Sequence, residues 1–256
     1  MGAAIATFGG GVDSVYTLQQ LGASLPAPTV LATGGNPGGY LRLTANINDQ
    51  HSFVPFDLTD AGTFPASTFS FQFRIDNLGA GGADGFSFSY LDTALFGATG
   101  ALGAAPFTAE DPAATGVLGF GFDTWGNGGG FDANGNSADY SEISLFYNGL
   151  LVQRVDDTRL LPVSLNLKDA AWHTVTGQIS FTGQTVSLSV DGNPIMTDVM
   201  VADLVPFESR ILFGGRTGGA NERASIDNVN VLYVPEPATG ALLVLGGLIA
   251  LRRRRT

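Results

Sequence analysis

Residues 68–75 read TFSFQFRI, an alternation of large apolar side chains with small or polar ones. Phe69, Phe71, Phe73 and Ile75 occupy every second position. Consecutive side chains of a β-strand point to opposite faces of a sheet, so this period of two is typical of a strand. The stretch therefore predicts a strand with one face in an apolar core and the other face near water.

The same period of two returns along most of the chain, with turn dipeptides such as Asp191-Gly192 and Thr182-Gly183 between the segments. No long window outside the C-terminal tail has a helical apolar stripe. Many antiparallel strands with one apolar face pack as two stacked sheets, so we predict an all-β antiparallel sandwich. Further strands are predicted around Phe86, Phe88 and Tyr90; Leu118, Phe120 and Phe122; Ile143, Leu145 and Tyr147; Val175, Ile179 and Phe181; and Val186, Leu188 and Val190.

The composition limits the possible partners. The chain has 256 residues, a length that one large β-sandwich commonly uses. Its formal net charge is −11, and an acidic surface repels nucleic acid and attracts cations. Because the sequence has no cysteine, disulfides and cysteine metal sites are excluded.

The C-terminal residues 234–256 read VPEPATGALLVLGGLIALRRRRT. The uncharged part is shorter than the roughly 20 residues that span a bilayer core, and arginines that follow an apolar segment stay on the cytoplasmic side. The order of the three parts resembles the PEP-CTERM sorting signal of bacteria, with Pro235, Glu236 and Pro237 as the triplet and Arg252 and Arg253 in the basic cluster. This resemblance implies an exported protein with a short hydrophobic helix that anchors it transiently in the inner membrane until an exosortase-type enzyme processes it. An ordinary C-terminal membrane anchor is the alternative.

The N-terminal residues 1–20 contain no basic residue and no apolar core of the secretory type. Ala6 also stands where an N-myristoylation signal needs Ser or Thr. Because the tail indicates export, we expect a leader that lies before this sequence or has been removed from it.

Residues 122–132 read FDTWGNGGGFD and place three oxygen donors, Asp123, Asn127 and Asp132, around four glycines after an apolar alternation. Gly, Asn and Asp are common turn residues, so a polar turn is one interpretation. Calcium takes carboxylate, amide and backbone oxygens from flexible loops, so a hard-cation site is the other. The local sequence leaves both open.

Four segments in order resemble the L-type (legume-type) lectins of the concanavalin A-like fold. They are ADGFSFSY (83–90), GALG (100–103), GFGFDTWGN (119–127) followed by Asp132, and ILFGGRTGGANERASIDNVNV (211–231). The resemblance implies a jelly-roll sandwich over residues 40–233, preceded by an N-terminal segment 1–39 that could add an outer strand and followed by the sorting segment 234–256.

The resemblance also implies a site for sugars. Asp84, which follows a cis peptide bond in the lectin pattern, would accept hydrogen bonds from sugar hydroxyls, and Gly103 would offer a backbone N–H. Trp125 would supply an apolar face, and Asn127 would be a further carbohydrate-binding residue. The last strand-loop-strand, with Arg216 and Gly218, would set sugar preference. That loop carries three charged residues, Arg216, Glu222 and Arg223, so an acidic polysaccharide is also a possible ligand. For Arg216 and Glu222, the equal alternative is that they are solvated residues at the tip of the loop.

For the metal, the resemblance implies Ca²⁺ bound by the side chains of Asp123, Asn127 and Asp132 and by the backbone carbonyl of Trp125. Legume members also bind a transition metal through a Glu two residues before the first Asp. Here that position is Gly121, so we expect calcium alone, with Glu142 near the vacated place.

The same fold also hosts glucan hydrolases, whose active strand carries paired carboxylates on one face. The corresponding strand here has Gly119 and Gly121 and no Glu, so we predict no enzyme activity. The predicted function is calcium-dependent binding of a glycan or polysaccharide in the cell envelope or extracellular matrix. The alternative is a non-catalytic structural matrix protein that uses the fold without binding sugar.

Overall fold

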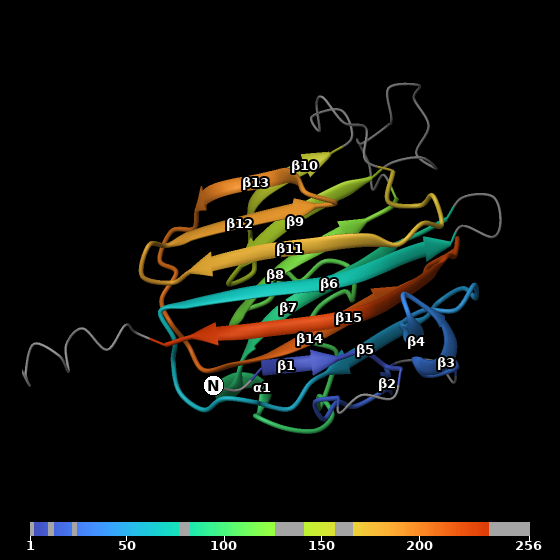
Figure 1. Cartoon of the computed structure of the whole chain (residues 1–256), viewed down its shortest axis with the longest axis horizontal. Coiled ribbons are helices and arrows are strands. Elements are labelled where there is room, and N and C mark those ends of the chain that lie inside the picture. The colour runs from blue at the N-terminus through green and yellow to red at the C-terminus, as the bar shows by residue number, and fades with distance from the viewer. Residues whose placement is uncertain are drawn as a thin grey trace, which may run out of the picture.

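The protein is a sandwich of two antiparallel sheets (Figure 1). The computed structural model describes residues 3–9, 13–21, 25–76, 82–125, 141–156 and 166–235. The predicted sandwich is confirmed, whereas the predicted C-terminal helix lies outside the described residues. Among the described residues, no helix is long and apolar enough to span a membrane.

One sheet has eight strands in the order β13-β12-β11-β6-β15-β4-β3, with β1 paired to β15. Its strands are β1 (Ala3–Ala6), β3 (Thr29–Gly35), β4 (Gly38–Arg42), β6 (Ala66–Asp76), β11 (His173–Ser180), β12 (Thr185–Val190), β13 (Asn193–Met200) and β15 (Arg223–Val234). Residues before position 40 therefore add strands to this sheet, and also to the other one through β2.

The other sheet has seven strands in the order β10-β9-β8-β7-β14-β5-β2. Its strands are β2 (Gln19–Gln20), β5 (His51–Pro55), β7 (Gly85–Asp92), β8 (Val117–Asp123), β9 (Glu142–Tyr147), β10 (Leu150–Asp156) and β14 (Ser209–Arg216). A single turn of helix, α1 (Thr93–Phe96), follows β7.

The alternation read from the sequence defines the inner faces of both sheets. β6 alternates buried and half-buried residues along most of its length, as expected for a strand with one face in the core. Across the sandwich, the ring of Phe71 packs edge-on against Phe213 at 5.2 Å, and Phe69 lies 5.3 Å from Phe120. Each fully buried ring contributes about 1.5–3 kcal/mol, so these aromatic contacts hold the two sheets together.

The outer face of the seven-stranded sheet is also covered, by residues 93–116. A second apolar cluster forms there, in which Leu102 and Ala109 pack with sheet residues such as Phe53 and Leu212. Arg210, only 1% exposed, fixes this segment because its guanidinium donates to the carbonyls of Gly100 (2.8 Å) and Phe96 (2.7 Å). The middle of the covering segment, at Glu110, reaches the strand ends that carry the candidate site, where Glu110 binds Arg216.

Candidate functional site

Three neighbouring strands of the seven-stranded sheet bring the candidate site residues to one end of the sandwich, at the right of Figure 1 where β6 ends. Gly85, the first residue of β7, stands opposite Asp123 of β8 and opposite Arg216 of β14. Arg216 in turn faces His51 of β5. Residues distant in the sequence are thereby placed around Asp84.

The backbone of Asp84 is held from both sides. Its N–H donates to the carbonyl of Arg216 (3.2 Å), and its carbonyl accepts from the N–H of Thr124 (3.0 Å). The Ala83–Asp84 peptide bond is cis, as in the lectin pattern, and Gly85 has a φ of +129°. A Cβ at Gly85 would lie 2.1 Å from the carbonyl oxygen of Phe122, so only glycine allows this close approach.

The carboxylate of Asp84 lies beneath the loop that follows β14. Its Oδ2 is 3.5 Å from the Nε of Arg216, and a Cβ at Gly218 would come within 2.9 Å of the same oxygen. Burial raises the pKa of Asp84, and the charges of Arg216 and His51 oppose that rise. Oδ2 accepts no hydrogen bond from any residue that the structure describes. The structure thus brings together three of the predicted sugar-site residues: Asp84, Arg216 and Gly218.

Glu110 is a fourth member of this cluster, and it was not predicted from the sequence. It lies on the covering segment and is 2% exposed, and its Oε1 accepts a hydrogen bond from Nη1 of Arg216. Glycines on the sheet make room for it, because a Cβ at Gly121 would lie 2.8 Å from the Glu110 carbonyl and one at Gly214 would lie 2.4 Å from the Ala109 carbonyl. Burial raises the pKa of Glu110, an effect that Arg216 opposes.

Asp123 ends β8 and begins the predicted metal loop. Its Oδ1 accepts from the N–H of Trp125 at 2.7 Å, which keeps the two proposed ligand residues in one tight turn. Burial raises the pKa of Asp123 to about 8, with a further contribution from the nearby charges of Asp111, Glu142 and Glu110. Glu142 stands opposite Asp123 on β9, where it pairs with Arg154 at 2.7 Å.

The described part of this loop fits calcium. A buried carboxylate crowded by other acids is stabilised by a divalent cation, and oxygen donors are what calcium prefers. Asn127 and Asp132 lie outside the described residues. Within the part of the chain that the structure describes, no three His, Cys, Asp or Glu side chains are grouped to hold a metal ion. The calcium ligand set therefore stays a prediction.

Thr124, in the described part of the predicted metal loop, contacts two buried ionic groups. Its hydroxyl donates to Oε1 of Glu222 (2.8 Å), and its carbonyl accepts from Nζ of Lys168 (2.9 Å). Glu222 is 0% exposed, and burial raises its pKa to about 7. The interpretation of Glu222 as a solvated loop residue is therefore wrong, because it joins the loop after β14 to the metal loop.

The remaining predicted residues lie elsewhere or outside the described chain. Gly103 is in the exposed part of the covering segment, where its neighbour Leu102 exchanges hydrogen bonds with the side chain of Gln19 (3.0 and 2.7 Å). None of the hydrogen bonds found among the described residues joins Gly103 to Asp84. Pro235 is the last described residue, and Glu236, Pro237, Arg252 and Arg253 lie beyond it.

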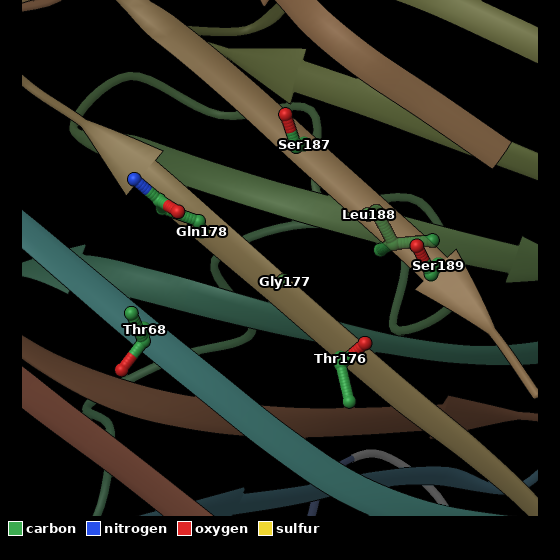
Figure 2. Close-up of a pocket in the computed structure, with 7 residues that line it drawn as sticks. All are labelled: Thr68, Thr176, Gly177, Gln178, Ser187, Leu188 and Ser189. Carbon is green, nitrogen blue, oxygen red and sulfur yellow. The ribbon is translucent and has the colours of Figure 1, made fainter. Parts of the chain in front are cut away.

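A separate hollow lies on the eight-stranded sheet (Figure 2). It is lined by residues of β6, β11 and β12, among them Thr68, Thr176 and Gln178. None of its seven lining residues is ionisable or aromatic. It therefore lacks the charged acceptors and the apolar ring that distinguish the Asp84 cluster.

The sheet order, the sandwich packing and the cluster at the strand ends together define a fold of the legume-lectin type. A scan against protein-family models and a search of curated protein sequences found no match. Solved structures do match. Peanut lectin with a nine-residue peptide has a TM-score of 0.61 and 17% sequence identity, and the match covers 90% of this chain and 95% of the lectin chain. The exoplasmic/lumenal domain of VIP36 in its Ca²⁺- and mannose-bound form has a TM-score of 0.58 and 11% identity over 91% and 89%. The lectin of Bauhinia forficata in complex with GalNAc has a TM-score of 0.59 and 18% identity over 92% and 99%.

Proposed function

We propose that this chain is a calcium-dependent carbohydrate-binding protein whose sugar site is the Asp84 cluster. The observation that carries the proposal is that Asp84, Arg216 and Gly218 meet at the strand ends, while the carbonyl of Asp84 is bound to Thr124 of the metal loop. Solved structures of the same fold include forms bound to Ca²⁺, mannose and GalNAc, which supports the proposal.

The geometry explains why such a site suits sugar hydroxyls. A hydroxyl is strongly hydrated, so a site that binds it needs acceptors that are already fixed in position and already shielded from water before the ligand arrives. Asp84 meets this requirement, because its backbone is hydrogen-bonded on both sides and the residue is only 7% exposed. Gly103, Trp125 and Asn127 would complete the contacts to the sugar. Asp123, Trp125, Asn127 and Asp132 would hold the calcium ion, which neutralises the acids around it and rigidifies the loop.

A binding role is favoured over hydrolysis by the outer face of β8. A glycosidase needs two carboxylates facing a substrate. On β8 a side chain at Gly119 would meet Ser89 Oγ at 2.5 Å, and one at Gly121 would meet the Glu110 carbonyl at 2.8 Å. The strand face that carries catalytic acids in hydrolases of this fold is here filled by the protein itself.

We also propose that the protein acts outside the cytoplasm, in the cell envelope or in an extracellular polysaccharide matrix. The three-part tail of residues 234–256 supports this location. The tail would anchor the chain transiently and present Pro235, Glu236 and Pro237 to an exosortase-type processing enzyme.

The test is a binding panel of plant and microbial polysaccharides, measured with the full chain in calcium and again in excess chelator. We expect saturable binding that the chelator abolishes and that Asp84→Asn reduces at least tenfold, because the amide loses a charged acceptor. A matched control is Asp198→Asn, an exposed aspartate whose Oδ1 contacts Ser187 on the eight-stranded sheet (3.1 Å). Absence of saturable binding to the whole panel in calcium would favour the structural matrix protein instead.

A further inference from the structure

The charged residues of the loop after β14 are all compensated inside the protein. Arg216 donates to Glu110 and lies 3.5 Å from Asp84. Arg223 binds Asp76 through two nitrogens, at 2.9 and 2.7 Å. Glu222 is buried beneath the loop. Each of these three side chains is therefore held by a partner within the protein.

The surroundings of Arg216 are net acidic. Asp84 and Glu110 contribute two carboxylates to one guanidinium. Burial and the charge of Arg216 lower the pKa of His51, so its imidazole adds little positive charge near neutral pH. The charged groups that act on one another around Glu110, Asp111 and Asp123 are five carboxylates, of Asp84, Glu110, Asp111, Asp123 and Glu142, and two guanidiniums, of Arg154 and Arg216. With Asp123 ionised, as calcium binding requires, this set has an excess of three negative charges, so one divalent cation at Asp123 still leaves one.

A sugar carboxylate would bind poorly in this field. Arg216 already faces two carboxylates, because its Nη1 donates to Glu110 and its Nε lies 3.5 Å from Oδ2 of Asp84. A sugar carboxylate would be a third carboxylate on the same guanidinium, and Glu110, 2% exposed, is poorly screened by water from that like charge. A neutral hydroxyl avoids that repulsion and can donate to a carboxylate while Arg216 stays in place.

We propose that the Asp84 site selects uncharged glycans over uronic acids, and that Glu110 is the residue that determines this specificity. The proposal rests on the proposed function, since it assigns a ligand class to the same site. Glu110 acts by holding Arg216 as an internal counter-charge. Without the Glu110 charge, the guanidinium of Arg216, whose side chain is 30% exposed, has only Asp84 to offset it and can attract an anionic ligand.

The experiment uses methyl glycosides in matched pairs that differ only at carbon 6: glucose and glucuronic acid, galactose and galacturonic acid, mannose and mannuronic acid. Affinities are measured by calorimetry with the full chain at a fixed calcium concentration. The variants are Glu110→Gln, the double variant Glu110→Gln/Arg216→Gln, and the control Asp76→Asn. The control frees an arginine, Arg223, in the same way but on the eight-stranded sheet.

The wild-type chain should bind at least one neutral member more than about tenfold tighter than its uronate. Glu110→Gln should shift that ratio toward the uronate by roughly tenfold, the value of one charge-assisted hydrogen bond. The double variant should reverse the shift, and Asp76→Asn should leave the ratio unchanged. Uronate binding by Glu110→Gln should also weaken as salt is added, whereas wild-type binding of the neutral sugar should not.

Equal or tighter binding of the uronate by the wild-type chain would overturn this inference and leave the proposed function standing. That result needs no variant, so it holds even where Glu110→Gln does not fold. A folded Glu110→Gln with the wild-type ratio would remove Glu110 as the determinant. Binding of neither member of any pair, together with no binding to the polysaccharide panel, would remove the proposed function and this inference with it.

Discussion

Replacing Gly218 by alanine should damage the sugar site without damaging the sandwich. The new Cβ would lie 2.9 Å from Oδ2 of Asp84 and 3.6 Å from Oδ1. Ordinary contact for such a pair begins near 3.4 Å, so the carboxylate or the loop must move by about 0.5 Å. The oxygen has little freedom, because Asp84 is 7% exposed and its backbone is held by Arg216 and Thr124.

The expected effect on binding is larger than the effect on stability. Local overpacking of this kind costs about 1 kcal/mol of folding free energy. A carboxylate displaced by half an ångström loses most of a charge-assisted hydrogen bond, so affinity for the sugar should fall at least tenfold, or about 1.4 kcal/mol. Calorimetric titration of the full chain in calcium, with a saccharide from the panel, measures the affinity, and thermal melting measures the stability.

Gly219→Ala is the matched control. The adjacent residue has open space where its Cβ would be added, so its affinity and melting temperature should stay near the wild-type values. Wild-type affinity in Gly218→Ala, with the fold intact, would refute the reasoning, because the sugar could not then depend on the Asp84 carboxylate.

Three further predictions follow from the buried ionisable groups. The folded pKa of Glu222, about 7, lies above the ordinary value of 4.5, so between these values the folded chain holds a proton that the unfolded chain releases, and stability falls as pH rises. The melting temperature of Glu222→Gln should therefore rise progressively relative to that of the wild type from about pH 5 to about pH 8, and a pH-independent difference would contradict this. Asp123, with a pKa of about 8, must lose a proton to bind calcium. The apparent calcium affinity, measured by calorimetry, should therefore rise by up to about tenfold per pH unit between about pH 6 and pH 8, and a constant affinity would exclude Asp123 as a ligand. Arg210→Met removes the hydrogen bonds to Phe96 and Gly100 and should cost about 3 kcal/mol while exposing residues 93–116 to limited proteolysis; unchanged protease resistance would show that Arg210 does not hold this segment.

The sequence predicts the inner faces of the sheets well, because one physical requirement, an apolar side chain at every second position, dominates there. All six predicted strands exist, including β6, β8 and β12. The outer face of the seven-stranded sheet gives no such signal. Its strands carry Gly and Ser at the outer positions, such as Ser87, Gly121 and Gly214, and small residues look solvent-facing although here they seat the covering segment.

The site could be predicted only where residue type and local spacing are informative. Asp84 and Asp123 stand within recognisable segments, and the structure brings them to adjacent strand ends. Glu110 is an isolated acid in a loop, and its pairing with Arg216 joins positions 106 residues apart. Glu222 looked like a surface charge because burial of a loop residue depends on what folds over it. Partners of this kind are fixed by the tertiary fold and have no periodic pattern in the sequence.

The most direct test of the central claim is a crystal structure of the full chain with calcium and a saccharide that binds it. The account predicts a sugar hydroxyl within hydrogen-bond distance of the Asp84 carboxylate, close to Gly218, and a calcium ion bound to Asp123. A saccharide seated in the hollow of β6, β11 and β12 (Figure 2), with no contact to Asp84, would contradict it.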